Sequence, residues 1–225
     1  MVTGPATPPR GTGSANLIVD STGGMIIARS GNQGVRFSAI TNLQYSTYRT
    51  SGGSLFAPAL QFTVDMDAND ANTAFQGRIV FEPFTAGAVQ TGVWQTWNPM
   101  SQGGWWFTRA PQNATCSQAD TCTWSEVLTL FPNIAIHPTD PGSMIFKAGG
   151  GWTGGFNGNV DAFTIGVNGD NTTYDFEAAA PPPPLVGPPT NKDQCKNGGW
   201  QTFNNPSFRN QGDCVSFVQS NGRGN

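Results

Sequence analysis

The chain has 225 residues, a length that fits one domain of ordinary size with a small appendage. Only 11% of the residues are charged, and the 11 Lys and Arg form no cluster among 14 Asp and Glu, which argues against nucleic-acid binding. The longest apolar runs, such as residues 25–28, are far too short to span a membrane.

The first segment, residues 1–14, contains Pro, Gly, Thr and Ser without an apolar pattern, so we expect a flexible arm there. A signal peptide would show a charged segment followed by an apolar one, and neither is visible. The cysteine pairs described below indicate export, and export chemistry without an export signal suggests a mature form or a fragment.

Short apolar segments, each bounded by Gly, Asn, Asp or Pro, fill residues 15–177. Phe62, Val64 and Met66 alternate with polar residues, the period of a strand with one face toward a core. Segments recurring about every 8–12 residues with turn signals between them predict a β-sandwich. The expected strands are 16–20, 24–29, 35–40, 45–49, 60–67, 77–83, 92–97, 104–109, 143–149, 160–167 and 172–177.

One segment has a helical pattern instead. Thr123 and Glu126 form a capping box, in which each side chain can bond the backbone N–H of the other residue. Apolar residues follow, and Pro132 prevents continuation. The pattern predicts one short helix at about 124–131.

The composition changes again after the body. Consecutive prolines in 178–189 predict a semi-rigid linker in the polyproline II conformation. The tail, 190–225, is too small to form a hydrophobic core of its own. We expect it to be held by a disulfide, to pack on another surface or to remain unstructured.

The four cysteines form two local pairs without the tight spacing of a zinc site. We favour two disulfides, Cys116–Cys122 and Cys195–Cys214, which implies an oxidising environment outside the cytoplasm. A cytoplasmic protein with four free thiols is the alternative.

Two stretches resemble known sequences. Residues 149–166, with Phe156-Asn157-Gly158-Asn159-Val160-Asp161, and residues 172–177 resemble the last strands of concanavalin A-like and laminin G-like jelly rolls in uncharacterised secreted bacterial proteins. The tail runs 192–200 and 210–218 resemble a Cys-bracketed motif at the C-termini of such proteins. The resemblance implies an all-β, concanavalin-like jelly-roll sandwich and an extracellular location. This superfamily includes lectins, glycosidases, lyases and adhesion domains, so it does not fix an activity.

Tryptophans are the main candidates for ligand binding, because an indole face can stack on a sugar ring. Residues an odd number of positions apart on a regular strand point to opposite faces. At most one of Trp105 and Trp106, and at most one of Trp94 and Trp97, therefore belongs to the core. Packing under loops is the alternative. The candidate binding residues are Trp94, Trp97, Trp105, Trp106 and Trp152, with Asn157 as a hydrogen-bonding partner.

A candidate calcium site follows the 60–67 segment. Asp65, Asp67 and Asn69 stand at alternate positions, and calcium prefers several oxygens close together. The run departs from an EF-hand, since Asp70 replaces its glycine and Gln76 its last glutamate. An Asx-rich turn is the alternative.

Catalytic patterns are sparse. Glycoside hydrolysis needs two carboxylates flanking one bond, and the three glutamates lack the Glu-x-Asp-x-x-Glu arrangement of hydrolases with this fold. Asp161, Asp175 or Glu82 could still converge in space. His137 is the only histidine, and no Gly-x-Ser-x-Gly motif accompanies it.

These features favour a secreted, non-catalytic protein that binds a polysaccharide or another glycan through exposed tryptophans. A structural, adhesion or self-assembling surface protein is the first alternative, and a polysaccharide hydrolase or lyase is the second. We expect no cofactor except possible calcium, no nucleic-acid partner and no membrane span.

Overall fold

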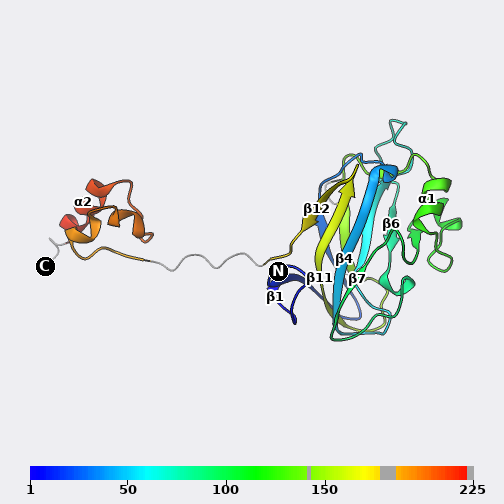
Figure 1. Cartoon of the computed structure of the whole chain (residues 1–225), viewed down its shortest axis with the longest axis horizontal. Coiled ribbons are helices and arrows are strands. Elements are labelled where there is room, and N and C mark those ends of the chain that lie inside the picture. Colours follow the sequence, from blue (N-terminus) through cyan, green and yellow to red (C-terminus); the bar gives the residue numbers. More distant parts are fainter. Residues whose placement is uncertain (141–142, 178–185, 222–225) are drawn as a thin grey trace. The chain divides into compact units, whose positions relative to one another are not determined.

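The structure is a computed structural model that describes residues 1–140, 143–177 and 186–221. The chain divides into two compact units, residues 1–179 and 180–225. We describe each unit by itself (Figure 1). The predicted linker lies largely outside the described residues, which resume at Val186.

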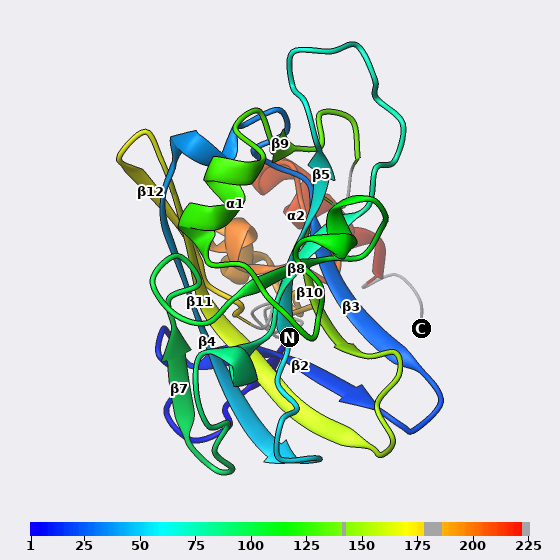
Figure 2. The same cartoon turned by 90° about the vertical axis from the view of Figure 1, so that its right-hand side faces the viewer.

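The first unit is an all-β sandwich of two antiparallel sheets (Figure 2). The first sheet has the strand order β1 (Val2–Thr3), β2 (Gly13–Val19), β11 (Phe156–Val167), β4 (Ile40–Ser51) and β7 (Trp94–Trp97), with β12 (Asp170–Tyr174) also on β11. The second has the order β3 (Gly24–Arg29), β10 (Met144–Gly149), β5 (Ala59–Asp65), β6 (Arg78–Phe81) and β8 (Trp105–Phe107), with β9 (Ala135–Ile136) on β5.

The core lies between the sheets and follows from the alternation of side chains along each strand. In β5, Leu60, Phe62 and Val64 point into it and are fully buried. Tyr45 from β4 and Trp105 from β8 each lie against Phe81 of β6, with ring centroids 6.3 and 5.5 Å away. Aromatic packing therefore joins the two sheets and contributes beyond the area it buries.

The predicted helix is present as α1 (Trp124–Leu130), one residue shorter than expected. Both halves of the capping box form: Glu126 N donates to Thr123 Oγ1 at 3.3 Å, and Thr123 N donates to Glu126 Oε2 at 2.8 Å. The Thr123 backbone bond lowers the pKa of Glu126. Helix α1 buries Trp124, which stacks on Phe37 at 5.1 Å.

One predicted strand is wrong. Residues 35–40 contain the 3₁₀ turn Phe37–Ala39, because Phe37 turns inward against Trp124 and Phe62 instead of pairing along a sheet. Two further 3₁₀ turns are Pro83–Thr85 and Gln112–Ala114.

The N-terminal arm also differs from the prediction. Residues 1–14 were expected to be flexible, but Val2 and Thr3 pair with Ser14 and Gly13 of β2. Glu177 accepts backbone N–H groups from Thr12 and Gly13, and Pro5 O accepts the indole N–H of Trp94 at 3.0 Å. Such polar backbone contacts leave no apolar pattern, which is why the sequence did not indicate them.

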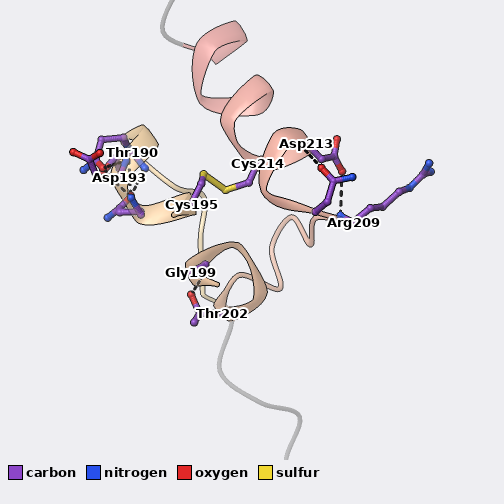
Figure 3. The surroundings of a disulfide bond; sticks show 11 residues. Thr190, Asp193, Cys195, Gly199, Thr202, Arg209, Asp213 and Cys214 are labelled. Atoms are coloured by element: carbon purple, nitrogen blue, oxygen red, sulfur yellow. Dashed lines mark hydrogen bonds between the residues drawn. A yellow bond between two sulfur atoms is a disulfide. The ribbon is translucent and has the colours of Figure 1, made fainter. Parts of the chain in front are cut away.

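The second unit is a small stapled fold (Figure 3). It contains the 3₁₀ turns Lys192–Cys195 and Gly199–Thr202, followed by α2 (Gln211–Asn221), a helix that the sequence did not predict. Cys195 and Cys214 are fully buried and bonded to each other, which joins the first turn to α2. Phe208 packs between Phe203 and Phe217, with centroids 6.1 and 5.4 Å away.

Both predicted disulfides are formed, Cys116–Cys122 in the sandwich and Cys195–Cys214 in the tail. Two disulfides fit an oxidising environment of the extracellular type. Within residues 1–140, 143–177 and 186–221, no helix has the length and apolar character needed to cross a membrane.

Candidate functional site

The candidate site is a groove on the outer face of the second sheet, with a volume of about 300 Å³. Cross-strand partners share a face, and Ile145, Gln61, Val80 and Trp106 are successive partners across β10, β5, β6 and β8. Their sequence neighbours belong to the core, so this row faces away from it. The groove is lined by Ala59, Gln61, Phe75, Arg78, Val80, Glu82, Trp106, Thr108, Gln118, Lys147, Gly149, Gly150, Gly151 and Trp152.

The floor of the groove combines an apolar and a polar side chain. Val80 and Gln61 lie side by side there and are only 1% and 6% exposed. Longer side chains around them form the walls, which explains how residues on an outer face are so well covered. Gln61 thus places an amide donor and acceptor at the bottom of an otherwise apolar strip.

Trp106 lies on one wall, held by a carboxylate. It is the outward neighbour of Trp105, which is fully buried and donates its indole N–H to Pro99 O at 2.8 Å. The Trp106 N–H donates to Glu82 Oε2 at 3.0 Å, and Gln118 Nε2 donates to the same oxygen at 2.9 Å. The orientation of the Trp106 ring is therefore fixed before any ligand arrives.

Trp152 comes from the glycine-rich loop. Gly149, Gly150 and Gly151 all have positive φ, at 78°, 79° and 114°, a backbone that side chains rarely allow. The half-buried indole stacks on Phe56 with centroids 4.2 Å apart and an interplanar angle of 5°, and it meets Phe156 edge-on at 5.1 Å. The loop is thus both a sharp corner and the support of a fixed aromatic side chain.

The other candidate binding residues do not reach the groove. Trp97 is 5% exposed and donates to Thr47 Oγ1 at 2.8 Å, and Trp105 belongs to the core, so neither offers a ring face to a ligand. Trp94, on the first sheet, packs against Tyr48. Asn157, in β11, accepts from Asn16 Nδ2 at 2.9 Å. The parity argument for each tryptophan pair is confirmed: one member is core.

The candidate calcium residues lie in a series of Asx turns. Asp65 Oδ1 accepts from Asp67 N at 3.1 Å, and Asp67 Oδ1 accepts from Asn69 N at 3.1 Å. Asn69 Oδ1 also accepts from the Arg36 guanidinium at 2.6 Å. Within the part of the chain that the structure describes, no group of three His, Cys, Asp or Glu could hold a metal ion.

His137 has a structural role. It is 3% exposed, and its Nδ1 lies 3.3 and 3.1 Å from the backbone N–H groups of Thr139 and Asp140, which donate to it. Nε2 then carries the proton and donates to Ala74 O at 3.2 Å. Both ring nitrogens are occupied in holding loops together.

Of the acids considered for hydrolysis, Asp161 and Asp175 lie near each other beneath the N-terminal arm, and Glu82 lies apart from them in the groove. Glu82 lines the groove, whereas Asp161, Asp175 and Glu177 hold the N-terminal arm against the first sheet. Arg10 N donates to Asp161 Oδ2 at 3.0 Å, and its guanidinium lies 3.6 Å from Asp175.

A second hollow, of about 270 Å³, is mainly apolar. Its lining includes Met144, Phe146, Phe163 and Phe176, with Arg29 at 4.4 Å from the Tyr174 ring centroid. Among the described residues, its polar lining residues are Arg29, Tyr174 and Asp175, and no tryptophan lines it, so we treat the groove, which has two, as the candidate site.

Several groove residues carry no signal in the sequence. Gln61, Arg78, Lys147 and Gln118 come from three strands and a loop, and only the register of the strands brings them together. The alternation in residues 60–67 shows that Gln61 faces away from the core, but no local pattern marks its neighbours.

The fold and the groove define a β-sandwich protein with an aromatic-walled, polar groove on one sheet. Comparison with known proteins found no matching family model, no matching curated protein and no matching solved structure.

Proposed function

We propose that the sandwich binds a polysaccharide in the groove on the second sheet, outside the cell, with Trp106 and Trp152 as its aromatic contacts. The observation that carries the proposal is the placement of these two indoles in one groove, each fixed by its own partners. Fixed aromatic side chains lose little freedom on binding, which favours affinity.

The polar lining suits a hydroxylated ligand. Gln61, Gln118 and Thr108 supply amide and hydroxyl groups that can donate and accept hydrogen bonds. A sugar ring presents an apolar face and a rim of hydroxyls, so it requires this combination of aromatic surface and polar groups. We also propose that the strands of the sandwich are connected as in a jelly roll.

Binding without hydrolysis is the favoured form of this function. Glycosidases use two carboxyl groups flanking the scissile bond. Glu82 is the one carboxylate among the described residues that line the groove, and its Oε2 accepts from both Trp106 and Gln118. Its role here is to orient an aromatic ring.

Retention of the full chain on a panel of polysaccharides tests the proposal. We expect Trp106→Ala and Trp152→Ala to weaken binding by about threefold to tenfold each, the range of an aromatic contact. Trp94→Ala is the matched control, because Trp94 is half-buried on the other sheet, and it should bind like the wild type.

Circular dichroism would confirm that each variant is folded, and the same tubes would be assayed for released reducing ends with and without calcium. Equal retention of Trp106→Ala and the wild type would contradict the proposed site. Release of sugar would favour a hydrolase or lyase, and a need for calcium would restore Asp65, Asp67 and Asn69 as ligands.

A further inference from the structure

The groove differs in charge from the domain that carries it. Residues 1–177 include 7 Lys and Arg and 12 Asp and Glu. Among the described residues lining the groove, the balance is reversed, with Arg78 and Lys147 against Glu82. The lining of the groove therefore carries a positive formal charge, opposite in sign to that of the domain.

Neither cation forms an ion pair with another described residue. The ion pairs in the described parts of the chain are Arg10–Asp175 and Asp193–Lys196, and both lie elsewhere. The Arg78 guanidinium carbon lies 5.8 Å from the Phe75 ring centroid, and its Nε is buried without a hydrogen-bond partner.

Lys147 lies at the opposite corner, against the glycine-rich loop. A Cβ placed on Gly150 would come within 2.9 Å of its Nζ, so the ammonium packs directly over this glycine, in the loop that carries Trp152. Only a residue without a side chain leaves this space for the Lys147 head group.

The spacing of the two cations indicates the size of the ligand. Lys147 pairs with Ala59 and Arg78 with Thr63, four residues further along β5. At about 3.3 Å per residue, the two positions are separated by about 13 Å along the strand, and, because β10 and β6 flank β5, by about 10 Å across the sheet. Gln61 lies midway, in the same row as Trp106. This span suits acid groups on separate sugars of a chain.

We propose that the groove binds an anionic polysaccharide, with Arg78 and Lys147 contacting acid groups on separate sugars while Trp106 and Trp152 contact the rings. The acid group is a carboxylate or a sulfate ester. This inference rests on the proposed function and adds the chemical class of the ligand. Charge then provides selectivity against neutral polysaccharides.

Polymers that share one backbone provide the test. Retention of the full chain would be measured on dextran, carboxymethyl-dextran and dextran sulfate, and on polygalacturonate beside its methyl ester. We expect the charged forms to be retained more strongly than their neutral partners. Raising the salt from about 0.1 M to about 1 M shortens the Debye length from about 10 Å to about 3 Å and should reduce this retention.

Variants localise the effect. Lys147→Gln should weaken binding of the charged polymers by about twofold to tenfold. Arg78→Gln should do the same if it remains folded. Glu82→Gln keeps an acceptor for Trp106 but removes the opposing charge, so binding should strengthen by about twofold. Arg29→Gln, an exposed cation on β3 outside the groove, is the control and should have no effect.

The outcomes separate the two proposals. Equal retention of neutral and charged polymers, with Lys147→Gln unchanged and Trp106→Ala weakened, overturns the inference and keeps the polysaccharide groove. An equal loss in Lys147→Gln and Arg29→Gln also overturns it, because the attraction is then not confined to the groove. Absence of retention on every polymer overturns both. A preference between the carboxymethyl and sulfate forms identifies the acid group.

Discussion

Asp161 is a buried acid of the sandwich. It lies on the outer face of the first sheet under the N-terminal arm and is fully buried. One carboxylate oxygen accepts from Arg10 N at 3.0 Å, and the other is buried without a hydrogen-bond partner. Burial raises the pKa of Asp161; backbone N–H groups, chiefly that of Ala162, offset part of this rise, and the nearby Asp175 adds a smaller increase.

The raised pKa predicts how stability changes with pH. The folded protein binds the Asp161 proton more tightly than the unfolded chain, whose carboxyl has a pKa of about 3.9. The free energy of unfolding therefore falls as the pH rises from about 3.9 through the folded-state pKa. Asp161→Asn lacks this decrease, so its stability relative to the wild type should increase with pH across that window. Urea unfolding midpoints measured from acid to neutral pH would show it.

Glu177 should behave in the opposite way and serves as the control. Backbone N–H groups of Gly13 and Thr12 lower the pKa of its carboxyl. Its contribution to stability is present above the unfolded pKa, about 4.3, and is lost as the pH falls. Glu177→Gln should therefore lose stability relative to the wild type as the pH rises. The same trend in both variants would contradict this description of the arm.

Individual site residues could be predicted only where a local pattern marks them. The adjacent pair Trp105 and Trp106 shows by parity that one indole faces outward, and the glycines around Trp152 indicate an unusual loop. Lys147 and Arg78 carry no such mark, because strand register places them around Gln61. A site on the face of a sheet depends on pairing between distant segments, which a single sequence does not contain.

The bounds of helices and strands could be predicted where apolar and polar side chains alternate regularly. Strand β3 begins and ends at the residues expected, whereas β4 and β11 extend beyond the predicted segments, since polar residues continue both strands. Helix α2 was missed because Gly212, Val215 and Val218 have low helix propensity and no clear apolar stripe marks a face. The Cys195–Cys214 disulfide supplies a constraint that propensity does not.

Helix α1 shows that a local signal can also be sufficient. Its capping box is complete, and the helix it starts places Trp124 and Val127 in the core. Removing the cap with Thr123→Ala should lower the free energy of unfolding by about 1 kcal/mol. Urea unfolding would measure the change.

A matched control is Thr129→Ala, in the same helix. The Thr129 hydroxyl donates to Ser125 O at 2.8 Å on the exposed side and caps no N-terminus. Its substitution should change stability by less than about 0.5 kcal/mol. If both variants were equally destabilised, the cap would not be the cause.

At the scale of the whole molecule, the two units rely on different sources of stability. The sandwich has a continuous core from both sheets. Among its described residues, the tail buries its two cysteines and Pro189, with a few half-buried aromatic side chains besides. Units this small usually need a disulfide, a metal or a partner to stay folded.

Loop-closure entropy gives the size of each disulfide's effect. Cys195–Cys214 spans a sequence separation of 19 and should stabilise the tail by about 3 kcal/mol. Cys116–Cys122 spans 6 and should contribute about 2 kcal/mol to a sandwich that has a large core besides. The same chemical change should therefore unfold one unit and only weaken the other.

Tryptophan reports on each unit separately. Trp200 is the single tryptophan of the tail, and the other six of the chain's 7 belong to the sandwich. In nuclear magnetic resonance spectra of the full chain, Cys195→Ser/Cys214→Ser should move the Trp200 indole N–H signal to the random-coil position and leave the other six dispersed. Cys116→Ser/Cys122→Ser should leave all of them dispersed and lower the unfolding midpoint of the sandwich. A dispersed Trp200 signal without its disulfide would mean that Phe203, Phe208 and Phe217 form a sufficient core by themselves.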